Sequence, residues 1–305
     1  MTDSSLAEMF IELKWDTTDD PFCDVYDVNY QGGIVRSFLR ESKAALDTLG
    51  QITSYAAVQL GAQFRTHTYS LFIVKGRARI LRWDRSGTIV TEAIEYNQSP
   101  LLAEFFRRYS VAPPEMRGKD ISASAPTPVE GLMARKSLNL DMTVPLIKLS
   151  IPNADGPLRY FLTSAPEVSL LYTPPGRATR GFTAYDVSRG IVVFLKDSWR
   201  IDLPDIQAEG KVYKMLKDAK VRHVPDCLDS GDILTAEYHA TKTHEYVKEL
   251  WACHSDAHFI PHRHYRLVLD VVGRVLVKYE SSYEMTAAVR NALIGENFYN
   301  AAGPH

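Results

Sequence analysis

Cysteine is scarce in this chain of 305 residues. Only Cys23, Cys227 and Cys253 are present, and no two of them form a Cys-x-x-Cys pair. An odd number of widely spaced thiols argues against a disulfide framework and is typical of proteins in reducing compartments. We therefore expect an intracellular protein, cytoplasmic or nuclear.

Long apolar segments and an excess of one charge are also missing. The best apolar stretch, 267–277, is interrupted by Asp270 and Arg274, and residues 1–8 have no basic region followed by an apolar run. These features predict no membrane span and no secretion signal. The 35 basic and 37 acidic residues give a net charge of -2, so the composition carries no nucleic-acid signal, and any binding of nucleic acid would be local.

The composition is that of an ordinary globular protein, and the length favours two domains of the α+β class. Residues 1–110 are expected to form a mixed α/β domain. Runs rich in β-branched and aromatic residues, separated by turn residues such as those of 84–87, predict an antiparallel meander with flanking helices. The expected strands are 9–15, 67–74, 78–83 and 88–93, and the expected helices lie within 35–60 and at 100–109.

Residues 111–143 collect prolines, serines and polar residues, which predicts a linker, and 144–305 form the second expected domain. Five short apolar runs indicate an antiparallel sheet. They are 146–151, 160–162, 168–172, 181–187 and 191–196. A helix over 204–218 with Asp202 as its N-cap, a buried strand at 266–272 and a helix at 281–300 are expected to follow.

One carboxylate in the second domain stands out. Ile206, Tyr213 and Leu216 form an apolar stripe on the expected helix. Glu209 lies on the same stripe, where an unpaired charge would cost several kcal/mol. Lys196, at the end of the preceding apolar strand, is the candidate partner. A strand lysine held by a helix glutamate is how kinases grip ATP phosphates, although an ion pair at the edge of a core would give the same pattern.

Two further segments occur in the order that a kinase requires. The turn 174–181 contains Gly176, Arg177 and Gly181, and its backbone amides could cover phosphates, although it lacks the usual three glycines. The strand ending at Leu269 runs into Asp270 and two valines, like a hinge that binds adenine. Each feature alone is compatible with an ordinary turn, and the order of the features is what suggests a kinase.

The residues of 193–200, preceded by 176–181 and followed by 264–268, resemble the fungal-type protein kinase family. The segments 10–15, 19–22 and 81–87 resemble the region before the kinase domain in that family. The resemblance covers nearly the whole chain and implies a protein-kinase-like N-lobe with an antiparallel sheet and one key helix.

The same resemblance implies ATP and Mg²⁺ as ligands, and a protein Ser/Thr or another hydroxyl group as phosphoryl acceptor. It assigns phosphate binding to Lys196 with its partner Glu209. It also assigns the phosphate-covering loop to Gly176, Arg177 and Gly181, and the adenine slot to Leu269, Asp270 and Val272.

The chain also departs from the kinase pattern. It contains no His-Arg-Asp catalytic loop with its following asparagine and no metal-binding Asp-Phe-Gly. In the family this loop would come close to where the sequence ends, at His305. We therefore expect no catalytic residue and no metal ligand in this chain, and a phosphotransferase that is inactive as given. A non-catalytic nucleotide-binding or protein-interaction fragment, in effect a pseudokinase, is the alternative.

Two other patterns suggest different chemistry. Glu12-x-Lys14 on a strand, followed by Gln51 and Tyr55 on a helix, resembles the PD-(D/E)xK nuclease core. Because that motif also needs an aspartate on an earlier strand, we favour a partner-binding relic of this restriction-endonuclease-like fold over an active nuclease. Four histidines in 254–264 have a spacing that suggests zinc, but Pro261 breaks any helix through them and ordinary loop histidines are favoured.

Overall fold

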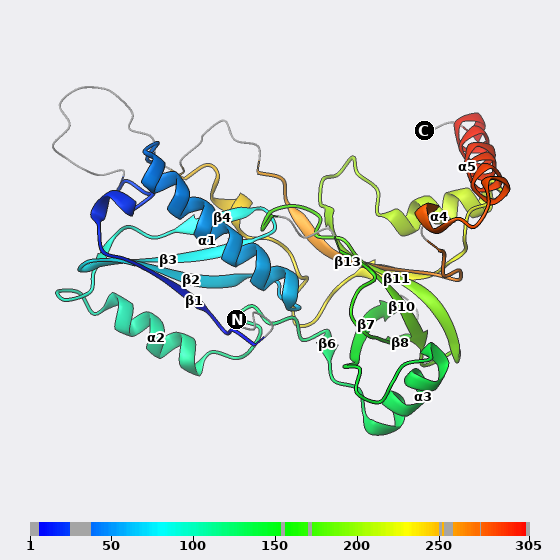
Figure 1. The fold of residues 1–305 in the computed structure, drawn as a ribbon, viewed down its shortest axis with the longest axis horizontal. Helices are drawn as coiled ribbons and strands as arrows, with labels where there is room; N and C mark the ends of the chain where they lie inside the picture. The colour runs from blue at the N-terminus through cyan, green and yellow to red at the C-terminus, as the bar shows by residue number, and fades with distance from the viewer. Residues whose placement is uncertain are drawn as a thin grey trace. The chain divides into compact units, whose positions relative to one another are not determined.

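The computed structural model describes residues 6–24, 38–153, 156–169, 173–249, 252, 259–274 and 276–302. It is a mixed structure of two β-sheets and five α-helices among these residues, which confirms the α+β class (Figure 1). The chain divides into two compact units. The first comprises 1–121, 170–178 and 240–262, and the second comprises 122–169, 179–239 and 263–305.

This division differs from the expected sequence of one domain, a linker and a second domain. Residues 122–143, two thirds of the expected linker, belong to the second unit, while 170–178 and 240–262 return to the first. Each unit is therefore built from segments that are distant in the sequence.

The sheet of the first unit has the order β1-β2-β3-β4, with β5 paired to β3. β1 is parallel to β2, and the pairs β2/β3 and β3/β4 are antiparallel, so the predicted meander is confirmed. The strands are β1 (Phe10–Lys14), β2 (Thr68–Val74), β3 (Arg77–Asp84), β4 (Gly87–Val90) and β5 (Ile94–Glu95). The helices are η1 (Thr17–Asp19), α1 (Lys43–Ala62) and α2 (Leu101–Val111).

The two long helices of the first unit cover opposite faces of its sheet (Figure 1). α1, whose first turn is capped by the Ser42 side chain, buries Ile52 and Leu60 in one core with Phe72 of β2. Side chains alternate along a strand, so Tyr69 projects from the other face, where its ring contacts Phe105 of α2.

The turn between β3 and β4 organises the distant segments of the first unit. Asp84 accepts hydrogen bonds from the backbone N–H groups of Lys242 (2.8 Å) and Thr243 (3.0 Å). Burial alone would raise the pKa of Asp84, but Arg82 and these donors hold it below its ordinary value. Arg85, which is fully buried, donates to the carbonyl oxygen of Pro174 (2.9 Å). The turn that the sequence predicts is thus also the attachment point for residues 240–262 and 170–178.

The second unit contains a sheet of order β12-β13-β11-β10-β8-β7-β6, with β9 paired to β10. The registered pairs among these described strands are antiparallel, as expected. The strands are β6 (Ala123–Ser124), β7 (Ile147–Asn153), β8 (Gly156–Thr163), β9 (Val168–Ser169), β10 (Arg180–Asp186), β11 (Ile191–Ile201), β12 (Cys227–Asp232) and β13 (His262–Leu269). The helices are α3 (Pro128–Leu138), α4 (Glu209–Asp218) and α5 (Ser282–Ala302), with short helices η2 (Thr243–Tyr246, in the first unit) and η3 (Leu276–Lys278).

Helix α3 lies inside the segment expected to be a linker. Its N-terminus has a capping box between Thr127 and Glu130, with Pro128 at the first helical position. The weak periodicity arises because only Gly131 and Ala134 are buried, and Ala134 packs against Leu162 of β8. Local capping and one small buried residue suffice to form this helix.

The helix expected over 204–218 begins later than predicted. α4 starts at Glu209 with Ala208 as its N-cap, so Asp202 is not the cap. The Asp202 carboxylate instead accepts hydrogen bonds from Arg263 (2.9 Å) and lies 3.2 Å from Arg200. The predicted C-terminal helix is confirmed as α5. No helix in the described part of the chain is long and apolar enough to cross a membrane.

Candidate nucleotide site

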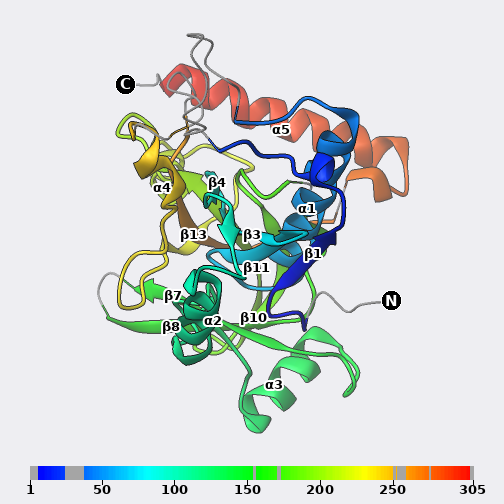
Figure 2. The ribbon, with the colours of Figure 1, turned by 90° about the vertical axis from the view of Figure 1, so that its left-hand side faces the viewer.

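Helix α4 lies beside the sheet that contains β11 (Figures 1 and 2), and Lys196 is a residue of β11. Alternation along the strand puts Phe194 and Lys196 on one face. Phe194 packs into a cluster with Tyr265 and Leu267 of β13 and with Ala208 and Tyr213 at the α4 side. The same packing therefore brings the lysine under the first turn of the helix.

Glu209 is the first residue of α4 and receives this lysine. The Lys196 Nζ lies 2.8 Å from Oε1 and 2.7 Å from Oε2 of Glu209, so both carboxylate oxygens accept from one ammonium group. The predicted ion pair is confirmed. It is half-buried, with 23% of the lysine and 28% of the glutamate side chain exposed, and it also places an anion at a helix N-terminus, where the helix dipole favours it.

A glycine that sequence reasoning missed fixes the position of Glu209. Gly210 is buried, and its N–H donates to the hydroxyl of Tyr265 on β13 (2.9 Å). A Cβ at this position would lie 2.0 Å from Oγ of Ser230 on β12 and 2.6 Å from the Tyr265 hydroxyl oxygen. Only glycine allows the helix start to approach the strands this closely. A glycine directly after the candidate glutamate was the available signal.

The negative charge of Glu209 contributes to the raised pKa values of two neighbouring side chains. Burial, and then the Glu209 carboxylate, raise the pKa of Tyr213. Burial also raises the pKa of the Cys227 thiol, with Asp229 and Glu209 adding to the effect. Both side chains are therefore neutral near pH 7. The Lys196 ammonium therefore faces the Glu209 carboxylate beside two uncharged side chains.

The residue after Lys196 anchors β11 from its other face. Asp197 is buried, with His264 Nε2 at 2.6 Å and Arg266 Nε at 2.8 Å from its Oδ1. Burial alone would raise the pKa of Asp197, but His264 and Arg266 outweigh it and hold the pKa well below its ordinary range. Because His264 and Arg266 both belong to β13, this network fixes β11 against that strand. The position of Lys196 follows from it.

The expected hinge residues come at the end of β13. Leu269 is buried and packs into the cluster beneath α4. Asp270 has a structural partner, since its Oδ1 accepts from the backbone N–H of Asp226 (2.9 Å) and its own N–H donates to the Asp226 carbonyl (3.1 Å). Val272 is 39% exposed. The predicted buried strand is confirmed up to Leu269, and the following residues leave the sheet.

The expected phosphate-covering turn is only partly assembled. Gly181 lies in β10 directly opposite Lys196 in the register of β10 and β11. Gly176 has a φ of 113°, which favours glycine, and its N–H donates to the carbonyl oxygen of Arg85 within the first unit (2.9 Å). Arg177 is exposed. The amide of Gly176 is therefore engaged, and Gly181 is the loop residue that the sheet aligns with the lysine.

A second predicted group of residues is also brought together, in the first unit. Lys14 on β1 lies 2.9 Å from Glu12 and donates to Oε1 of Gln51 on α1 (2.9 Å). The Gln51 amide in turn donates to the hydroxyl of Tyr55 (2.7 Å). The hydrogen bond to Glu12 raises the pKa of Lys14. All four residues of the nuclease-like pattern thus form one hydrogen-bonded chain.

The two described histidines of 254–264 have separate partners. His254 and His258 lie outside the described residues. The His262 ring lies 2.8 Å from the carbonyl oxygen of Ile260, and burial lowers its pKa. His264 belongs to β13, as expected, and pairs with Asp197.

Comparisons of the chain with protein-family models, with curated proteins and with solved structures give no match. The function of the chain is therefore inferred from the geometry of the Lys196–Glu209 pair and of the Glu12–Lys14–Gln51–Tyr55 chain.

Proposed function

We propose that the second unit binds ATP in the manner of a protein-kinase N-lobe, with Lys196 as the ligand of the phosphates. The observation that carries the proposal is the ion pair in which both Glu209 oxygens hold the Lys196 ammonium at 2.7–2.8 Å. In kinases such a glutamate orients the strand lysine toward the α- and β-phosphates.

The order of the strands supports the proposal. β11 lies between β10, which carries Gly181 opposite Lys196, and β13, which ends at Leu269. A nucleotide whose phosphates contact Lys196 would have β10 beside the phosphates and the end of β13 beside the base. Leu269, Asp270 and Val272 would supply the adenine slot, and Gly181 of β10 would lie beside the phosphates. Mg²⁺ would accompany the nucleotide, with its protein ligands missing from this sequence.

Nucleotide binding without phosphoryl transfer is the proposed activity of this chain. Transfer requires an aspartate that orients the acceptor hydroxyl and a second aspartate for the metal, in motifs that the sequence does not contain. We also propose that a protein partner or substrate contacts the second unit when the nucleotide is bound.

A thermal-shift titration with ATP and Mg²⁺ tests the binding. A ligand at 100 times its Kd stabilises the folded state by about 2.7 kcal/mol, so we expect a concentration-dependent rise in Tm. Lys196→Ala should abolish the rise. Lys214→Ala is the matched control, because Lys214 lies on the same helix as Glu209 but is 74% exposed and contacts Asp218. An equal rise in Lys196→Ala would refute the assignment of the lysine.

The absence of transfer is tested with radiolabelled ATP. We expect no autophosphorylation and no turnover by the isolated chain. Autophosphorylation that requires Mg²⁺ and disappears in Lys196→Ala would overturn the non-catalytic assignment while supporting the nucleotide site.

The hydrogen-bonded chain in the first unit favours a second candidate function. We propose that this unit is a nuclease-like fold that contacts a partner and does not cleave nucleic acid. The Glu12 carboxylate is already paired with Lys14, and the further carboxylate that the metal chemistry needs has no counterpart on a preceding strand of the described chain. Cleavage of DNA with Mg²⁺ or Mn²⁺ that is lost in Glu12→Ala would contradict this assignment.

A further inference from the structure

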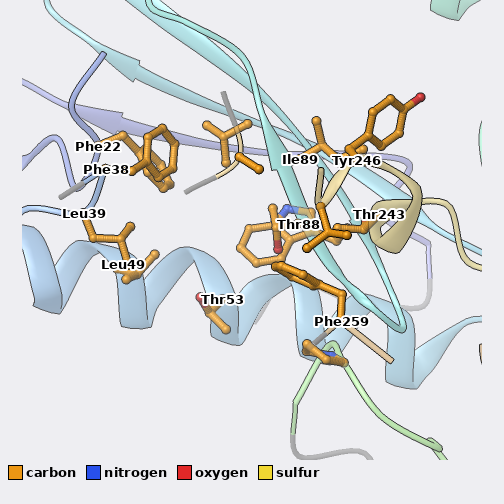
Figure 3. Close-up of a pocket in the computed structure, with 15 residues that line it drawn as sticks. Phe22, Phe38, Leu39, Leu49, Thr53, Thr88, Ile89, Thr243, Tyr246 and Phe259 are labelled. Carbon is orange, nitrogen blue, oxygen red and sulfur yellow. The ribbon is translucent and has the colours of Figure 1, made fainter. Parts of the chain in front are cut away.

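The first unit contains an apolar cavity that neither proposed function uses (Figure 3). Its volume of about 330 Å³ is within the range of small-molecule sites. α1 and the sheet form part of its wall, and Phe22, Phe38 and Leu39, which precede α1, form another part. Pro175 and described residues between 243 and 259, from the distant segments of the first unit, complete the described wall. The aromatic residues in the wall are Phe22, Phe38, Trp83, Tyr246 and Phe259.

The described part of the wall is unsuited to a charged ligand. Among the described residues, the lining includes no lysine, arginine, histidine, aspartate or glutamate, and its polar side chains are three threonines and one tyrosine. A phosphate or carboxylate placed here would lose its hydration without gaining a cationic partner. The cavity is therefore unsuited to ATP, and a neutral, largely apolar molecule is the ligand class that it fits.

One polar atom of the wall lacks a partner. The Oγ1 of Thr243 is buried and has no hydrogen-bond partner among the described residues. The backbone N–H of Thr243 donates to Asp84 (3.0 Å). The Thr243 methyl group packs so closely against Gly87 that a Cβ on Gly87 would lie 3.1 Å from it. These two contacts fix the position of Thr243. An unpaired buried hydroxyl costs about 1–3 kcal/mol, which a ligand with one hydrogen-bonding group would offset after a rotation of the side chain.

The cavity is preformed, because hydrogen bonds hold its wall in place without a ligand. The turn at 84–87 ties the segment that carries Thr243 and Phe259 to the sheet: Ser86 donates to Oγ1 of Thr241 (2.7 Å) or to the carbonyl oxygen of Ile260 (2.7 Å). A preformed cavity keeps the entropy cost of binding low. We propose that it is a binding site for a neutral, mainly apolar small molecule, aromatic in part, with a single hydroxyl or amine that Thr243 recognises.

Binding of the neutral probe N-phenyl-1-naphthylamine to the full chain, followed by its fluorescence, tests the cavity. We expect one site per chain with micromolar affinity. Thr53→Trp, on the α1 wall, should fill the space and weaken binding at least tenfold. Ser54→Trp is the matched control, because Ser54 is the next residue of α1 but is exposed and outside the cavity. Absence of saturable binding, or equal binding by both variants, would overturn the proposal.

Thr243→Val tests the hydrogen bond separately, because it keeps the shape and removes the hydroxyl. The unaltered chain should bind 1-naphthol more tightly than naphthalene in competition with the probe. Thr243→Val should reduce this preference about three- to tenfold and leave naphthalene binding nearly unchanged, and it should raise the Tm of the unliganded chain because the unpaired buried hydroxyl is removed. An unchanged preference would refute the role of Thr243. These binding measurements do not depend on ATP, so they test the cavity independently of the proposed nucleotide site.

Discussion

Gly210→Ala should loosen the contact that holds Glu209 over Lys196. The new Cβ would lie 2.0 Å from Oγ and 2.7 Å from Cβ of Ser230, and 2.6 Å from the hydroxyl oxygen of Tyr265. The Ser230 hydroxyl can rotate away, but its Cβ cannot. Tyr265 is held by the hydrogen bond from the Gly210 N–H. The start of α4 must therefore shift away from β12 and β13.

The size of the effect follows from opposing contributions. Overpacking of a well-packed site costs about 1–3 kcal/mol. The weakened buried hydrogen bond increases the loss of stability by about 1 kcal/mol. The better helix propensity of alanine offsets at most about 1 kcal/mol of this loss. The net loss should be about 1–3 kcal/mol, or a fall in Tm of about 3–9 °C for a unit of this size.

Urea and thermal unfolding, followed by circular dichroism and tryptophan fluorescence, measure this loss. Gly50→Ala is the control, because Gly50 lies in α1 and a Cβ there would meet nothing within 4 Å. That variant should be neutral or more stable by up to about 1 kcal/mol. If Gly210→Ala is as stable as Gly50→Ala, the close approach of α4 to the strands is refuted.

Three further outcomes are expected. Glu209→Gln should weaken ATP binding, measured by calorimetry, about tenfold because Lys196 is no longer oriented. The free energy of unfolding in urea should change by less than about 1 kcal/mol because the pair is partly exposed. A loss of stability without a loss of ATP affinity would show that the pair is purely structural. Burial and the charge of Arg82 lower the pKa of His67 to about 3, so its stabilising effect is complete above pH 6.5 and is lost as pH falls. Between pH 7 and pH 5 the free energy of unfolding should fall by up to about 2 kcal/mol more than in His67→Phe, and parallel pH profiles of the two proteins would contradict this. Asp197→Asn should leave Arg266 and His264 without their buried anion and destabilise the second unit by about 3–5 kcal/mol, which urea unfolding would show against the exposed control Asp218→Asn.

Local patterns in the sequence predicted many elements and one key contact. Strand alternation and turn residues located the meander of the first unit, and the buried run before Asp270 located β13. The pairing of Lys196 with Glu209 followed from the cost of an unpaired carboxylate on an apolar helix face. Such predictions succeed where the physical cause lies within one or two adjacent elements.

What the sequence did not reveal depends on contacts between distant segments. The return of 170–178 and 240–262 to the first unit depends on Asp84, Arg85 and Ser86, whose side chains also suit a simple turn. α3 was missed because its apolar face is limited to small residues. The late start of α4 follows from the engagement of Asp202 by arginines, which only the folded sheet brings near.

The proposed nucleotide site requires Lys196 to contact the phosphates of the bound nucleotide. Titration calorimetry of Mg²⁺-ATP and of adenosine into the unaltered chain and into Lys196→Met separates this contact from binding of the base. We expect Lys196→Met to lose at least tenfold in affinity for ATP and to keep its affinity for adenosine, and we expect Lys214→Met to be unchanged for both ligands. Equal ATP affinity in Lys196→Met and the unaltered chain would contradict the proposed contact.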